Sequence, residues 1–131
     1  MSKTLDLEKI KTTVEGITGF PVFGTDIQKD ELDANESFFL YYEKGPIRKA
    51  DSGANQFLRD FILMFVTKED AEIDEFALIL ELPKCGLRFR NTEYEFGKIA
   101  STEQEAKLST FYFHQALIIC QQNTNWTMSN Q

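Results

Sequence analysis

Two segments of the chain are apolar at consecutive positions, and this feature constrains the fold more than any other. Residues 56–67 read QFLRDFILMFVT, and residues 108–120 read LSTFYFHQALIIC. A strand that exposes one face to water alternates apolar and polar side chains. Both segments instead carry apolar side chains at odd and at even positions. Each face of the sheet that they form therefore needs cover.

In both segments, each of the two faces of a strand would carry apolar side chains. In a strand, one face would carry Leu58, Ile62, Met64 and Val66, and the other would carry Phe57, Phe61, Leu63 and Phe65. In the second segment, the corresponding sets are Phe111, Phe113, Leu117 and Ile119 against Leu108, Tyr112, Ala116 and Ile118. Two helices alone cannot cover both faces, so one face is expected to be left for another subunit.

Helical periodicity occurs at two places. Within residues 4–17, apolar side chains recur at the spacing of an amphipathic helix, and Gly19 follows as a stop signal. A second helix is expected over residues 68–82, because Thr67 and Asp70 have the spacing of a capping box. The apolar stripe of this second helix would consist of Ile73, Phe76, Ala77 and Leu80, widened by Leu78, Ile79 and Leu82, and so broad a surface is expected to be buried against the sheet.

The remaining segments predict strands and turns. Residues 37–43 are dense in aromatic side chains, residues 87–100 alternate as one or two short strands, and residues 26–36 are a polar loop. Turn-rich residues 44–55 make a long hairpin with the strand that follows. The predicted fold is α+β: an antiparallel or mixed sheet with a long hairpin and two main helices packed on one face. Residues 1–120 form a single domain, followed by a polar, flexible tail over residues 121–131.

Charge and composition limit the classes of function. The formal net charge is −7, which argues against a protein that grips nucleic acid through its phosphates. The N-terminus does not resemble a signal peptide, and no apolar run approaches the roughly 20 residues of a membrane span. Cys85 and Cys120 have apolar neighbours and are expected to be buried, reduced thiols, as in a protein made in the cytoplasm.

Candidate catalytic and metal-binding residues are few. His114 is the sole histidine and lies inside a predicted strand, where a packed histidine is the simpler interpretation. Asp70 and Asp74 share a helix face, but carboxylates at a helix start usually complement the helix dipole. Hydrolase, nucleotide-binding and zinc motifs do not occur. No catalytic, cofactor or metal residue is therefore assigned.

Three residues are candidates for contact with a subunit or partner. Arg48 and Lys49 are placed at the tip of the long hairpin loop, where they are solvated, contact an acidic neighbour in a ring, or contact passing DNA phosphates. Trp126, in the polar tail, is the only tryptophan and a candidate anchor on a neighbour.

The layout resembles a known family. An amphipathic helix leads into GFPVF at residues 19–23; then come FFLYYEKGPIRKADSGANQ at 38–56, FILMFV at 61–66, an acidic helix start and STFYFHQALII at 109–119. This order of elements and this hydrophobic pattern resemble the tail terminator and minor capsid-like neck proteins of long-tailed, siphovirus-type bacteriophages.

The resemblance implies a hexameric ring that caps the tail tube, stops its polymerisation and joins it to the head connector. DNA would pass through the ring without specific binding, and the protein would reside in the virion after assembly in the host cytoplasm. The family supplies no catalytic residue and no cofactor for this chain.

Two other classes of function stay open. The first is a small binding module that docks a partner protein on the open sheet face. The second is a metal-dependent nuclease that uses acids near Asp70 and Asp74, although an enzyme would need a polar cleft rather than an open apolar face.

Overall fold

The two apolar segments pair with each other at the centre of a sheet. In the computed structural model, β4 (Gln56–Thr67) runs antiparallel to β6 (Glu105–Gln122) along its whole length. The structure describes residues 5–51, 56–98, 105–122 and 125–130, and it describes Lys29, Leu32, 118–122 and 125–130 by their backbone alone. Within these ranges the sheet has seven strands, and β4 and β6 confirm the two strands predicted from the apolar segments.

The other strands line the two outer edges of this central pair. β2 (Ser37–Tyr42) and β3 (Ile47–Lys49) share the outer edge of β4, and β1 (Val22–Gly24) runs parallel to β2. β5 (Arg88–Lys98) and β7 (Asn125–Asn130) share the outer edge of β6. The sheet is thus mixed but mostly antiparallel, which confirms the α+β class.

The two strands that pair with the outer edge of β6 are β5 and β7. β5 is one strand of 11 residues, longer than the one or two short strands expected, and its pairing with β6 is irregular between Phe89 and Asn91. A bulge of this kind lets a strand bend without ending. β7 lies within the segment predicted as a flexible tail and pairs with β6.

The first helix forms near its predicted place. α1 (Leu7–Thr18) begins after Asp6, whose side chain accepts a hydrogen bond from the backbone N–H of Lys9 at 3.1 Å. It ends at Gly19, whose φ of 78° lies in the left-handed region that favours glycine. The predicted polar loop over residues 26–36 contains a short helix, α2 (Lys29–Asp33).

The second predicted helix is much shorter than expected. α3 (Glu75–Glu81) begins after Asp74, which accepts a hydrogen bond from the N–H of Ala77, and continues into the 3₁₀ helix η1 (Leu82–Cys85). The start predicted at residue 68 is wrong because Thr67 caps a turn instead. The Thr67 hydroxyl accepts a hydrogen bond from the N–H of Ala71 at 2.9 Å. Within this turn, Asp70 adopts a φ of 56°.

The apolar stripe predicted for this helix is also wrong in part. Leu78 is fully buried, and Leu82, four residues later in η1, is buried beside it. Phe76 and Leu80, which were expected to face the core, are 76% and 68% exposed. At about 100° of rotation per residue, Phe76 and Leu80 lie on the side of α3 opposite to Leu78.

The core is built on one face of the sheet. The strand register aligns buried aromatic and leucine side chains across the sheet, and these are Phe39, Phe61, Leu63, Phe65, Phe111 and Phe113. Ile10 and Val14 of α1 and Leu78 of α3 belong to the same buried cluster. We call this surface of the sheet the core face.

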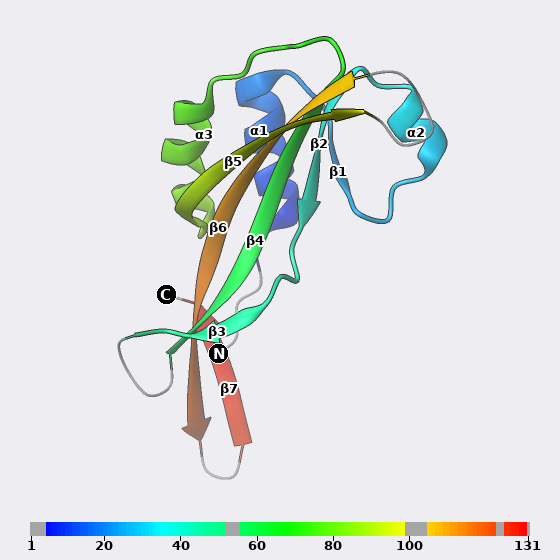
Figure 1. The fold of residues 1–131 in the computed structure, drawn as a ribbon. Helices are drawn as coiled ribbons and strands as arrows, with labels where there is room; N and C mark the ends of the chain where they lie inside the picture. Colours follow the sequence, from blue (N-terminus) through cyan, green and yellow to red (C-terminus); the bar gives the residue numbers. More distant parts are fainter. Residues whose placement is uncertain (1–4, 52–55, 99–104, 123–124, 131) are drawn as a thin grey trace.

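Part of the sheet extends away from the helices as an arm. Figure 1 shows β3, β7, the first half of β4 and the end of β6 running beyond the ends of α1 and α3. Gly45 lies where the chain enters this arm, and its N–H donates to the carbonyl of Asp60 at 3.1 Å. A Cβ at Gly45 would lie 2.5 Å from that oxygen, so a side chain does not fit there.

Candidate interaction site

The opposite surface of the central strands is also apolar, but its side chains are less buried than those of the core face. We call it the open face; its side chains are Leu40, Leu58, Ile62, Met64, Val66, Leu108 and Tyr112. Each of them is half-buried, and none belongs to the core cluster or to the apolar side chains packed against it. The open face is therefore an apolar surface that is shielded only in part within the described residues.

The burial of the open face and that of the core face differ between neighbouring residues of the same strand. In β4, Phe61, Leu63 and Phe65 are at most 2% exposed, whereas Ile62 and Met64 between them are half-buried. Successive side chains of a strand point to opposite faces, so this alternation is a difference between the two faces. It confirms that β4 carries apolar side chains on both.

One corner of the open face is covered. Phe38 is only 4% exposed, because the ring of Phe23 lies 6.4 Å from its ring centre and the ammonium of Lys68 lies 6.0 Å away. These neighbours come from β1 and from the chain just after β4. The uncovered region of the open face thus lies towards β4 and β6.

A group of charged residues borders the open face at the start of the arm. Asp60 and His114 are cross-strand partners, and one carboxylate oxygen of Asp60 lies 3.3 Å from both Arg48 and Arg90. Arg88 is aligned with His114 on the other side. We call Arg48, Arg88 and Arg90 the arginine cluster. Three guanidinium groups against one carboxylate make this border positive in a chain whose net charge is −7.

His114 has an environment that favours its neutral form. Burial lowers its pKa from the ordinary value of 6.5, and Arg48, Arg90 and Arg88 lower it further, while Asp60 raises it. Its Nδ1 is buried without a hydrogen-bond partner among the described residues. The histidine thus lies at the border of the open face, with no described base or nucleophile bonded to it.

The predicted pair Arg48 and Lys49 does not lie at a loop tip. Both residues belong to β3, which is paired with β4, and they point to opposite faces of the sheet. Arg48 is held by Asp60, whereas Lys49 is exposed on the other side. The prediction that they lie at the loop tip is wrong, because the pairing of β3 with β4 continues the hairpin through these two residues. The backbone of Trp126 lies in β7, opposite Gln121, and the side chains of Trp126 and Cys120 lie outside the described part.

The outer surface of α3 is a feature that sequence reasoning missed. Phe76 and Leu80 are one helical turn apart and both are largely exposed, next to Glu72 and Asp74, which are also exposed. We call Phe76 and Leu80 the α3 outer surface. The sequence shows how broad the apolar stripe of this helix is, but the whole stripe was expected to be buried against the sheet, and Phe76 and Leu80 are not.

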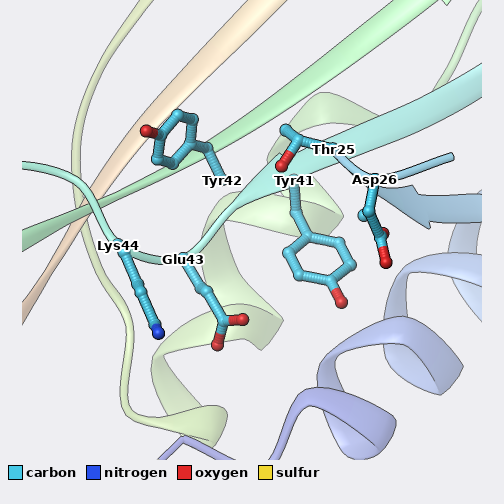
Figure 2. Close-up of a pocket in the computed structure, with 7 residues that line it drawn as sticks. Thr25, Asp26, Tyr41, Tyr42, Glu43 and Lys44 are labelled. Atoms are coloured by element: carbon cyan, nitrogen blue, oxygen red, sulfur yellow. The ribbon is translucent and has the colours of Figure 1, made fainter.

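A shallow hollow lies at the end of β2, next to α1. Figure 2 shows Tyr41 turned towards α1, with Asp26 and Glu43 beside it, and Tyr42 turned to the opposite side of the strand. The hollow has a volume of about 360 Å³. Burial raises the pKa of Tyr41, and the charges of Glu43, Asp26 and Glu8 raise it further, so this phenol stays protonated. The ring of Tyr41 stacks on that of Phe61, which makes it a packing residue.

Metal-binding and membrane-spanning elements are not found in the described ranges. There, no three His, Cys, Asp or Glu side chains are grouped to hold a metal ion. Asp70 and Asp74, the acids of the nuclease hypothesis, have separate roles, since Asp70 lies 3.7 Å from Lys107 and Asp74 caps α3. No helix among the described residues is long and apolar enough to cross a membrane.

Comparison with known proteins leaves the resemblance as a hypothesis. No protein-family model matches the chain, and no curated protein matches it either. The open face, the arginine cluster and the α3 outer surface are therefore interpreted from their own chemistry.

Proposed function

We propose that the protein is a structural component of a bacteriophage virion, a ring-forming tail terminator that caps the tail tube and joins it to the head connector. The observation that carries this proposal is the open face. Several large apolar side chains of two adjacent strands, among them Ile62, Met64 and Tyr112, lie outside the core cluster. A contiguous apolar patch of this kind is typical of a protein–protein interface.

The arrangement of the helices supports self-assembly. Ile10 of α1 and Leu78 of α3 belong to the same buried cluster as the phenylalanines of the core face, so we infer that both helices pack on that face. The other face is then free for a neighbouring subunit. A hexameric ring, with its contacts repeated at each subunit boundary, would cover every open face in this way.

Charge is compatible with the role of the ring as a passage for DNA. A net charge of −7 provides little attraction for phosphates, so DNA would move through the ring without specific binding. In this proposal the partners are further copies of the chain, the tail tube protein and the head–tail connector. The role is structural rather than catalytic, and the protein would be found in the virion after assembly in the host cytoplasm.

Electron microscopy of the purified protein mixed with tail tubes tests this function. The proposal predicts rings at one end of each tube and tubes of uniform length when the protein is present during polymerisation. Unchanged tubes without rings, together with a monomeric protein at high concentration, would reject it and favour the binding-module hypothesis.

A further inference from the structure

The α3 outer surface has the properties of one half of an interface. Phe76 is 76% exposed and Leu80 is 68% exposed, on a helix of only seven residues. Their opposite neighbour on the helix, Leu78, is fully buried in the core. The helix is therefore apolar on two sides, and only one of these is used by the fold of a single copy.

The open face has the properties of the other half. It is apolar and broad, and among the described residues none of its side chains belongs to the cluster that α1 and α3 join. A sheet face is commonly covered by a helix with an apolar side, which is the arrangement on the core face of this same sheet. The open face thus lacks the kind of element that the α3 outer surface would supply.

We propose that Phe76 and Leu80 of one copy pack on the open face of the next copy, against Ile62, Met64 and Tyr112. This inference rests on the proposed self-assembly and names the two surfaces that meet. The contact joins two different surfaces. Each copy would therefore bind one neighbour through its open face and a second neighbour through its α3 outer surface. Such a head-to-tail contact closes into a ring when the rotation between copies allows it.

Charge complementarity supports this choice of occupant. The exposed carboxylates of Glu72 and Asp74 precede Phe76, and α3 has no basic residue in its last turn. The arginine cluster borders the open face, with Arg88 exposed and the side chains of Arg48 and Arg90 41% and 36% exposed. The acidic start of α3 would thus point towards the arginine cluster, which fixes the direction of the helix on the sheet.

Two single substitutions test the contact from its two sides. Phe76→Asp damages the helix surface and leaves the open face intact, and Met64→Asp does the reverse. Each variant alone is expected to assemble at least about tenfold more weakly than the unmodified chain, since a charge would be placed in an apolar contact. Gln28→Asp adds the same charge at an exposed position outside both surfaces and serves as the control, with assembly unchanged.

A mixture of the two variants gives the decisive result. Phe76→Asp keeps an intact open face, and Met64→Asp keeps an intact α3 outer surface. In an equal mixture, the open face of the first variant is expected to bind α3 of the second, which gives one-to-one dimers that grow no further. Sedimentation velocity measures the masses, and circular dichroism confirms that each variant is folded. If Met64→Asp does not fold, Met64→Gln replaces it as the milder change.

The outcomes separate this contact from the proposed function. Assembly of Phe76→Asp at the concentration of the unmodified chain would overturn the contact and leave self-assembly in place. Failure of the mixture to form dimers, with both variants folded and monomeric, would also overturn it. An unmodified chain that stays monomeric, alone and with tail tubes, would remove both the contact and the proposed function.

Discussion

The core face and the open face are made by the same strands and are nearly equal in apolar content, yet they differ in burial. Leu63 is fully buried and its neighbour Met64 is half-buried, although both lie in the middle of β4. Side chains of α1, α3 and η1 belong to the core cluster, whereas the side chains of the open face do not. Apolar strand residues therefore indicate that a face must be covered, but they do not indicate by what.

The same comparison applies to α3 at a smaller scale. Leu78 supports the fold, whereas Phe76 and Leu80 are available to a partner. If the open face and the α3 outer surface serve assembly, substitutions there should affect association more than stability. Substitutions on the core face should do the opposite.

The largest expected effect is on the core face. Leu63→Asp should reduce the free energy of unfolding by more than about 4 kcal/mol, since it buries an unpaired carboxylate among aromatic rings. Met64→Asp, one residue away, should cost about 1–2 kcal/mol, because the open face still admits water. Urea denaturation measures both, and equal losses would contradict the distinction between the two faces.

The next largest effect on stability is expected on the buried side of α3. Leu78→Ala should destabilise the fold by about 2–5 kcal/mol through lost burial and a cavity, whereas Leu80→Ala should change stability by less than about 0.5 kcal/mol. Thermal denaturation of the two variants provides the measurement. A large loss for Leu80→Ala would show that this side chain supports the fold of a single copy.

A moderate effect is expected where charges border the open face. Asp60→Asn should reduce the free energy of unfolding by about 1–2 kcal/mol, since Arg48 and Arg90 would lose their shared carboxylate. Lys49→Asn, on the opposite side of β3, should have almost no effect on stability. Chemical denaturation distinguishes the two, and similar values would argue against a structural role for Asp60.

The smallest effect is the pH dependence due to His114. Because its pKa is lowered in the folded state, the unfolded chain binds a proton first as the pH falls below 6.5. Stability should therefore decrease as the pH falls from 6.5 towards the lower pKa of the folded state, and this histidine should contribute nothing above that window. In His114→Asn the same titration should show a shallower decrease. An identical pH profile would mean that the histidine has the same pKa in both states.

Much of the sheet could be predicted from local pattern. β2, β4 and β6 have dense aromatic and β-branched runs, and α1 has clear periodicity with a glycine stop, so their existence followed from the sequence. α3 was harder, because Thr67 fits both a capping box and a turn. The turn forms because the Thr67 hydroxyl accepts a hydrogen bond from the N–H of Ala71. The same hydroxyl is hydrogen-bonded to Ser37 of β2, which is a tertiary contact.

The candidate site was predicted less well than the fold. Arg48 and Lys49 were identified as a basic pair, but β3 separates them onto opposite faces, and Asp60 holds only Arg48. The arginine cluster is assembled from β3 and β5, which are far apart in the sequence. The exposure of Phe76 depends on the rotation of α3 against the sheet. Sequence spacing gives no local signal for the first two features, and the broad apolar stripe of α3 does not show which of its sides would be exposed.

The mass of the unmodified chain in solution, compared with that of Met64→Asp, tests the central claim most directly. Sedimentation velocity over a range of concentrations should show a discrete assembly for the unmodified chain and a folded monomer for the variant. An unmodified chain that remains monomeric throughout, or a variant that assembles equally well, would contradict the claim that neighbouring copies cover the open face.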